Sequence, residues 1–210
     1  ADDLDPDETA TDTFTYTVKD DDNKNADTGE IVITVTGVND EIIAVDDTDS
    51  VNEDATISRS TSDAQELDAD DTDADGDDVP GAFTITAIRT GSESGSGTSG
   101  TIGQALTGTY GTLTVNTDGS YTYVADQNAA DSIVTGQTAT DTFTYTVRDH
   151  SSGDTDTAEL VFTVTGINDE NPVAVDDTDS VNRDATIERA AGSSFDINAD
   201  DTDADGDSLT

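Results

Sequence analysis

The feature that most constrains the fold is a long internal repeat. The segment TATDTFTYTVKD at 9–20 recurs as TATDTFTYTVRD at 138–149, and ITVTGVNDE at 33–41 recurs as FTVTGINDE at 162–170 with the same offset. AVDDTDSVNEDATI at 44–57 recurs as AVDDTDSVNRDATI at 174–187, with an offset longer by one residue. One residue is therefore inserted just after Glu170, and a tolerated insertion marks a loop or linker. The period exceeds the ~20–50 residues of a solenoid unit and suits a sandwich domain of ~100 residues.

The repeat predicts three parts in the chain. Residues 1–40 are the C-terminal part of a preceding repeat, 41–169 form one complete repeat, and 170–210 are the N-terminal part of a following repeat. Each partial repeat would leave sheet edges unpaired. The sequence leaves three outcomes open for them: completion by residues of a longer chain, completion by neighbouring chains, or fraying.

Strict alternation of apolar and polar residues predicts β-strands. In 141–147 the side chains of Phe143, Tyr145 and Val147 share one face and threonines take the other. The stretch 158–166 alternates in the same way, and the first copy repeats both patterns. A period of two is typical of a half-buried strand, and threonine suits the wet face.

The complete repeat contains further strand signals. The stretch 111–124 reads as a hairpin that turns at 116–119, where Asp-Gly is the turn cue. Residues 82–88 predict another strand, 51–57 a short first strand, and 91–100 a Gly/Ser loop. Short strands separated by turns predict an all-β protein, an antiparallel Ig-like or cadherin-like β-sandwich in a tandem array.

The charge excludes several classes of function. Seven basic and 49 acidic residues give a formal charge of 7 − 49 = −42. So anionic a chain will not bind nucleic acid through a basic face, and no apolar run approaches the ~18 residues of a membrane span. The chain has no Cys and a single His, His150, so thiolate and multi-histidine metal sites are excluded. Although the apolar content is only 31%, the apolar residues are concentrated in alternating runs, which favours folding over disorder.

The densest acidic segment predicts a calcium site. DADDTDADGDD at 68–78 contains the pattern D-x-D-x-D-G, in which alternate carboxylates converge while Gly turns the backbone. The candidate ligands in the two copies are Asp71, Asp73, Asp75, Asp77, Asp201, Asp203, Asp205 and Asp207. An EF-hand needs Glu at the twelfth position, which is Ala82, so this is not an EF-hand. The alternative is a solvated acidic loop, but so many carboxylates repel one another unless a cation neutralises them.

The junction between repeats is a second acidic cluster. The candidate ligands there are Asn39, Asp40, Asp46, Asp47, Asn168, Asp169, Glu170, Asp176 and Asp177. An amide, carboxylates and backbone carbonyls at a domain boundary are suited to an interdomain Ca²⁺ clamp, and the alternative is an ordinary Asn-Asp turn. Asp20, Asp22 and Asp149 are expected in solvated loops, and Asp118 is expected to serve the hairpin turn.

Three motifs carry a resemblance to a known family. YGTLTVNTDGSYTYVAD, TDTFTYTVRD and TAELVFTVTGIND follow one another over most of 44–170. In that order they resemble the VCBS and cadherin-like tandem repeats of giant bacterial RTX-type surface adhesins. The resemblance implies extracellular Ig-like domains in long arrays, stiffened by Ca²⁺ at junctions that include Asn39, Asp40, Asn168 and Asp169. Because 170–172 reads ENP where 41–43 reads EII, the two junctions need not bind equally well.

These observations predict a calcium-stiffened structural extender of a long extracellular bacterial adhesin or surface fibre. Its expected partners are neighbouring repeats of the same chain and other copies in a fibre, at the cell surface or secreted. The alternative is a Ca²⁺-dependent carbohydrate- or cell-binding module. That reading needs exposed aromatics, whereas the Phe and Tyr residues lie mostly at core-facing positions and Tyr110 is the one candidate. An enzyme is not expected, because the acids cluster in loops without an apolar pocket.

Overall fold

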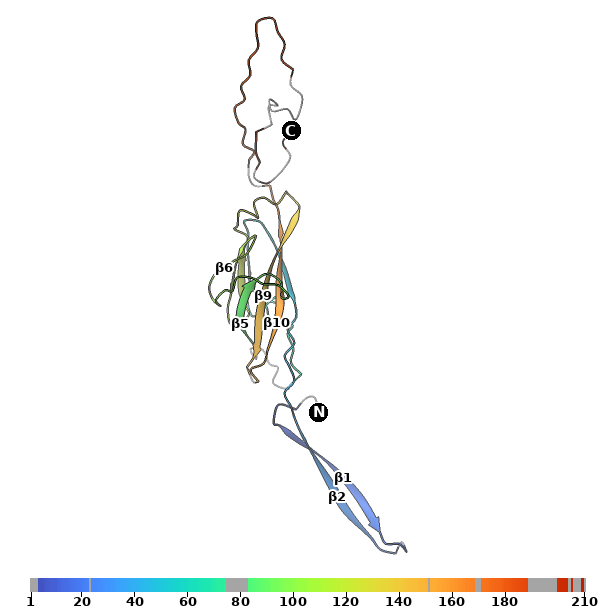
Figure 1. The fold of residues 1–210 in the computed structure, drawn as a ribbon. Coiled ribbons are helices and arrows are strands. Elements are labelled where there is room, and N and C mark those ends of the chain that lie inside the picture. Colours follow the sequence, from blue (N-terminus) through green and yellow to red (C-terminus); the bar gives the residue numbers. More distant parts are fainter. Residues whose placement is uncertain are drawn as a thin grey trace.

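The computed structural model describes residues 4–22, 24–74, 83–150, 152–168, 171–188, 200–203, 205 and 209. Within them, strands form a separate hairpin, β1-β2, and two four-stranded sheets with the orders β3-β10-β9-β5 and β4-β8-β7-β6 (Figure 1). The strands are β1 Thr9–Lys19, β2 Ala26–Thr36, β3 Asp47–Asn52, β4 Thr56–Arg59, β5 Phe83–Thr90, β6 Leu106–Thr107, β7 Thr112–Val115, β8 Tyr121–Val124, β9 Thr138–Asp149 and β10 Thr155–Thr165. The described residues include no helix long and apolar enough to cross a membrane.

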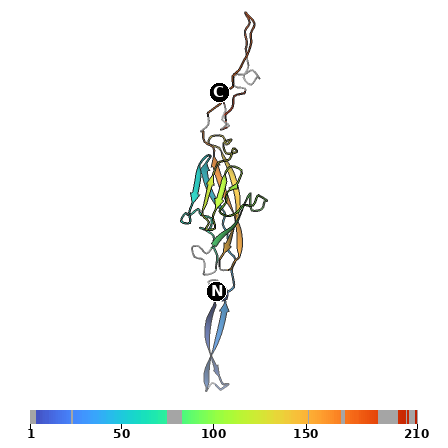
Figure 2. The ribbon, with the colours of Figure 1, turned by 90° about the vertical axis from the view of Figure 1, so that its left-hand side faces the viewer.

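The two four-stranded sheets form a β-sandwich (Figure 2). Aromatic side chains fill its centre. The rings of Tyr123 and Phe162 stack with centroids 3.9 Å apart, and Tyr121 meets Phe162 edge-on at 5.7 Å. The buried apolar residues of the described chain all lie between Ile42 and Val164. The alternation predicted for β9 and β10 is confirmed, since their apolar side chains are buried in the core.

The predicted hairpin at 111–124 is also confirmed. Leu113 pairs with Tyr123 and Val115 with Tyr121 across the turn. Gly119 has a φ of +77°, which L side chains rarely adopt, so glycine is required at this position of the turn. Asp118 accepts hydrogen bonds from the backbone N–H and the hydroxyl of Ser120, as expected of a turn residue.

The single strand predicted at 51–57 is wrong. Two strands replace it, because β3 ends at Asn52 and β4 begins at Thr56 in the other sheet. Asp54, with a φ of +59°, turns the chain between them, and its N–H donates to the carbonyl of Ala125. β3 runs parallel to β10, so the sandwich is not purely antiparallel. Parallel pairing follows because β3 and β10 are joined by a crossover rather than by a hairpin.

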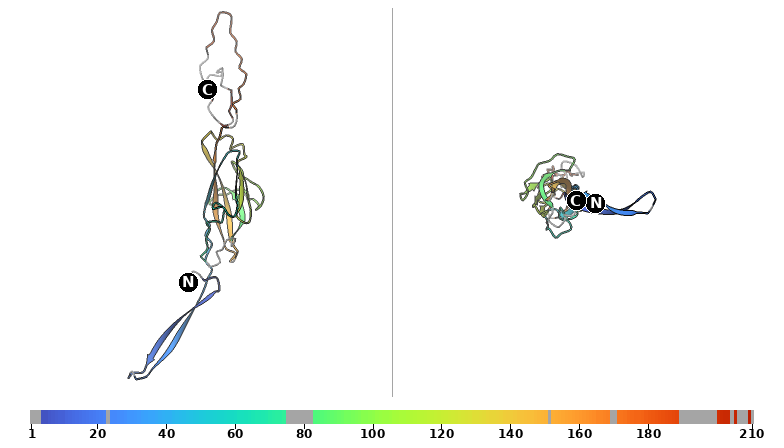
Figure 3. Two further views of the ribbon diagram at one scale, coloured as in Figure 1. Left: turned by 180° about the vertical axis from the view of Figure 1, so that it is seen from behind. Right: turned by 90° about the horizontal axis from the view of Figure 1, so that it is seen from below.

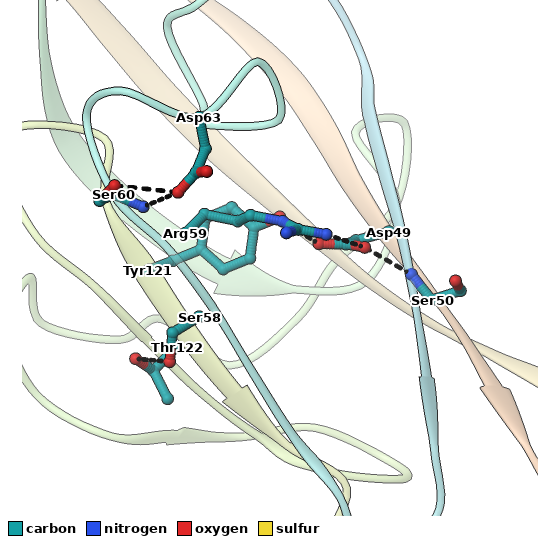
Figure 4. A network of polar contacts seen from close by, with 8 residues as sticks. All are labelled: Asp49, Ser50, Ser58, Arg59, Ser60, Asp63, Tyr121 and Thr122. Atoms are coloured by element: carbon teal, nitrogen blue, oxygen red, sulfur yellow. Dashed lines mark hydrogen bonds and ion pairs between the residues drawn. The ribbon is translucent and has the colours of Figure 1, made fainter.

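A partly buried ion pair ties β3 to β4 across the open edge of the sandwich (Figure 4). Arg59 donates from Nε to Asp49 Oδ2 at 2.8 Å and from Nη2 to Asp49 Oδ1 at 2.9 Å. The hydroxyl of Tyr121 donates to the same carboxylate at 3.0 Å. A bidentate arginine–carboxylate pair has a fixed geometry, so it sets how the two edge strands face each other.

The hairpin β1-β2 repeats the register of β9-β10, but no second sheet covers it among the residues that the structure describes. Phe14 pairs with Ile31 as Phe143 pairs with Leu160 at the equivalent positions of the next copy. The side chain of Phe14 is 50% exposed, whereas that of Phe143 is fully buried. The hairpin, the sandwich and residues 171–188 follow one another along the molecule (Figures 1 and 3).

Candidate metal centre

The incoming linker and the acidic loop, treated as two clusters in the sequence, lie side by side at one end of the sandwich. Ile43 and Thr72 exchange two backbone hydrogen bonds of 2.8 and 3.1 Å. Next to this bridge, the N–H of Val45 donates to Asp71 Oδ1 at 2.8 Å. The acidic loop therefore folds back on the chain that enters the domain.

The loop between β9 and β10 and the start of β10 bring further carboxylates to the same end. Asn39 donates from Nδ2 to Asp154 Oδ2 at 2.6 Å, and the N–H of Ala44 donates to Asp156 Oδ2 at 3.0 Å. Sequence reasoning did not select Asp154 and Asp156, because only the pairing of β9 with β10 and of β10 with β3 brings the loop and the start of β10 to the linker. The one available signal was the dense acidity of that loop.

Asp71 and Asp47 at this end are buried, and so is Asp149, for which the expectation of a solvated loop is wrong. Asp71 is 5% exposed, and its Oδ2 has no hydrogen-bond partner. Burial raises the pKa of Asp71 to about 7, although the hydrogen bond from Val45 opposes the rise. Burial likewise raises the pKa of Asp47 to about 8, against the hydrogen bond that Tyr145 donates at 2.8 Å. A buried carboxylate without a cation is unfavourable, so the orphaned oxygen of Asp71 fits a metal ligand.

The second copy of the acidic loop makes the same contacts. Val173 and Thr202 exchange backbone hydrogen bonds of 2.7 and 3.0 Å. The N–H of Val175 donates to Asp201 Oδ1 at 2.8 Å. These contacts join the same positions of the repeat as the bridge and the Asp71 hydrogen bond of the first copy. The loop-to-linker arrangement is thus a property of the repeated sequence.

The other predicted ligands divide between the two ends of the sandwich. Asn39 is exposed, Asp40 and Asp73 are half-buried, and Asp46 accepts a hydrogen bond from the N–H of Glu159 at the incoming end. Asn168 is exposed at the outgoing end, where the chain leaves β10.

The remaining predicted ligands belong to the following repeat or lie outside the described residues. In the second copy, Asp176 and Asp177 are exposed, Asp203 is half-buried and Asp205 is buried. The predicted ligands outside the described residues are Asp75, Asp77, Asp169, Glu170 and Asp207. Within the described part of the chain, no three acidic, His or Cys side chains converge as a formed metal cluster.

Comparison with known proteins decides the family. The profile of the bacterial cadherin-like domain matches residues 39–166, which contain the whole sandwich. The chain belongs to this family. A cadherin-like domain is a non-catalytic module, and such domains are generally found in surface or extracellular proteins.

Two individual proteins are similar to parts of this cadherin-like chain. It is 36% identical over 77 residues to the calcium-binding lectin RapA2 of Rhizobium johnstonii. That match spans 37% of this chain and 32% of RapA2, so the chain covers about a third of its relative. The crystal structure of the N-terminal four Ig domains of Dscam1 isoform 4.44 matches with a TM-score of 0.33 and 11% identity, covering 79% of this chain and 37% of that chain.

The opposite end of the cadherin-like domain has its own buried carboxylate, which sequence reasoning also missed. Glu53 is almost fully buried and accepts a hydrogen bond from the N–H of Ile167, just before Asn168. The N–H of Glu53 donates to the carbonyl of Thr165 at 2.9 Å. Both ends of the domain therefore place an acidic side chain against a linker.

Proposed function

We propose that this chain is a calcium-stiffened extender segment of a long bacterial surface adhesin or fibre. The observation that carries the proposal is the hydrogen bond from the linker to Asp71, whose second oxygen is buried and unpartnered, and its repetition at Asp201. Neighbouring repeats of the same array are the first partners, and other copies in a fibre are the second. The resemblance to VCBS repeats of RTX-type adhesins supports the same assignment.

Calcium would act by cancelling the repulsion between carboxylates at the junction. Ca²⁺ takes 6–8 oxygen ligands, and Asp47, Asp71, Asp156 and the side-chain carbonyl of Asn39 are of the right type. Because Asn39 belongs to the linker and Asp71 and Asp156 to the sandwich, a cation held between them would fix the linker against the domain. Without it, like charges separate and the junction becomes a hinge, which is the default for short linkers.

With the affinity expected for such a site, we expect Ca²⁺ to stiffen the junction outside the cell rather than in the cytosol. Extracellular Ca²⁺ modules have dissociation constants of ~10⁻⁴–10⁻³ M. At ten to a hundred times that concentration, each site adds ~1.4–2.7 kcal/mol to the free energy of unfolding. Several sites would rival the ~5–15 kcal/mol of a whole domain. The array would then stay loose in the cytosol and fold and stiffen after export.

Thermal melting with and without Ca²⁺ tests the proposal. We expect the melting temperature to rise in millimolar CaCl₂ relative to EGTA, with a much smaller rise in MgCl₂. Asp156→Asn should reduce the rise, because it removes one ligand charge at the linker. Asp22→Asn removes the same charge from the exposed β1-β2 loop and should leave the rise unchanged. An unchanged melting temperature in EGTA would exclude a structural role for calcium.

The lectin relative supports a second candidate, a Ca²⁺-dependent carbohydrate-binding module. Its support from side chains is thinner. Tyr110 is half-buried against the core, as expected of a packing residue, and the exposed aromatics Phe14 and Tyr16 lie on the β1-β2 hairpin. Binding to a glycan array in CaCl₂ and its loss in EGTA would establish this function. An extender alone should leave the array blank.

A further inference from the structure

A second acidic region lines an open cavity of about 960 Å³, which borders the linker contacts at Asp71 and Thr72. The cavity is bounded by the segment 61–72 after β4, by the start of β5 and by the turn between β7 and β8. Its acidic lining consists of Asp63, Glu66, Asp68, Asp70, Asp71 and Asp118. Asp70 and Asp118 are exposed, whereas Glu66 and Asp71 are buried, and no hydrogen bond observed among the described residues joins Glu66 to the linker.

Glu66 is buried and lacks a partner for one oxygen. Its side chain lines the cavity but is only 4% exposed, and Oε1 accepts no hydrogen bond. A Cβ placed on Gly119 would lie 1.8 Å from Glu66 Oε1 and 3.1 Å from Asp68 Oδ1. Two carboxylates therefore converge on the same point of the β7-β8 turn, where only glycine leaves room for them.

The charges around Glu66 are of its own sign. Burial first, then the hydrogen bond and charge of Asp68 and the charges of Asp118 and Asp47, together raise the pKa of Glu66 to about 9. Arg59, the basic residue just before this segment, is ion-paired with Asp49 rather than with Glu66. Ionised Glu66 is buried beside a second, half-buried carboxyl group, which is unfavourable, so the pair must either hold a proton or bind a cation.

We propose that Glu66, Asp68 and Asp118 hold a Ca²⁺ ion inside the domain, separate from the linker. Asp118 is exposed and uses Oδ1 for Ser120, so its other oxygen can close on the Glu66–Asp68 pair when the ion binds. Water in the cavity completes the 6–8 oxygen ligands. The ion fastens the loop that carries Asp71 to the β7-β8 turn, and it needs neither the linker nor a neighbouring repeat.

The repeat supports oxygen ligands at these positions. In the second copy, Glu66 and Asp68 correspond to Asp196 and Asn198. Both substitutions keep an oxygen donor while changing size or charge. The residue between them is Leu67 in one copy and Ile197 in the other, so both copies have an apolar residue between two residues with oxygen-bearing side chains.

Isothermal titration calorimetry of the whole chain with CaCl₂ tests the proposal. Glu66→Gln should lose one Ca²⁺ equivalent per chain, and Asp118→Asn should weaken that equivalent at least tenfold. Asp63→Asn, which removes a charge from the same cavity and keeps the oxygen that accepts from Ser60, should bind as wild type. Asp71→Asn should keep this equivalent and lose the linker one, so the two sites fail separately.

A shared proton in place of a cation would overturn the proposal. In that case Glu66→Gln and Asp118→Asn would both retain the full number of Ca²⁺ equivalents. Glu66→Gln is nearly isosteric, and its melting curve in EGTA reports whether it folds. If Glu66→Gln does not fold, Asp118→Asn decides between a proton and a cation. Its side chain is exposed and keeps the oxygen that accepts hydrogen bonds from Ser120 in the turn.

Discussion

The substitution Asp71→Asn should have opposite effects with and without calcium. Asparagine keeps an oxygen to accept the hydrogen bond from Val45 but removes the buried charge. Without a cation, that charge is a cost to the folded state. With Ca²⁺ bound, it is a ligand. The variant should therefore stabilise the calcium-free protein and weaken its response to calcium.

The pKa of Asp71 sets the size and the sign of the effect. It is about 7 in the folded chain and near 3.9 in the unfolded chain, so folding favours the protonated form. The stability from this group is complete below about pH 4 and is lost as the pH rises through 7. The full difference is at most ~4 kcal/mol. We expect half of it, ~2 kcal/mol, to remain after solvent screening.

Scanning calorimetry in EGTA at pH 5 and pH 8 measures this directly. Wild type should melt higher at pH 5, whereas Asp71→Asn should depend less on pH and melt ~3–8 °C above wild type at pH 8. In saturating CaCl₂, the variant should lose the ~1.4–2.7 kcal/mol of one site. A variant that melts below wild type in EGTA and keeps the full calcium response would refute this reasoning.

Three further predictions concern the fold. Residues 39–168 alone should melt within a few degrees of the full chain in CaCl₂, because the buried core lies within them; circular dichroism checks this, and loss of folding would contradict it. Arg59→Met should cost ~1–3 kcal/mol in urea unfolding, since it strands the carboxylate of Asp49, and the double variant with Asp49→Leu should recover most of that loss. Asp141→Ala should cost ~3–5 kcal/mol in the same assay, because it leaves three loop N–H groups and the Tyr123 hydroxyl without their acceptor; a cost below ~1 kcal/mol would contradict the network.

The strands of the sandwich were predictable because their signal is local. Phe143 and Leu160 lie in runs whose period of two is independent of the rest of the chain, and Asp-Gly marks the β7-β8 turn. The break between β3 and β4 was not predictable in this way. Asp54 turns there because the two flanking segments join different sheets, which is a tertiary requirement.

The sequence predicts the kind of ligand at the candidate site, but it does not predict all of the residues that lie there. The acidic spacing selected Asp71, and the structure places it against the linker. The sequence did not identify Asp156, because its contact with the linker forms only when the sheets assemble. It did not identify Glu66, because the burial of this side chain cannot be read from the sequence. The repeat, in contrast, carries the contact of Val45 with Asp71 over to Val175 and Asp201.

Small-angle X-ray scattering of the chain in CaCl₂ and in EGTA tests most directly whether calcium makes the array stiff. With calcium, we predict a larger maximum dimension, a smaller cross-section and a single narrow distribution of lengths. In EGTA, the distribution should broaden and its mean shorten as the junctions bend. Superimposable curves in the two buffers, at a Ca²⁺ concentration that calorimetry shows to be saturating, would contradict the account.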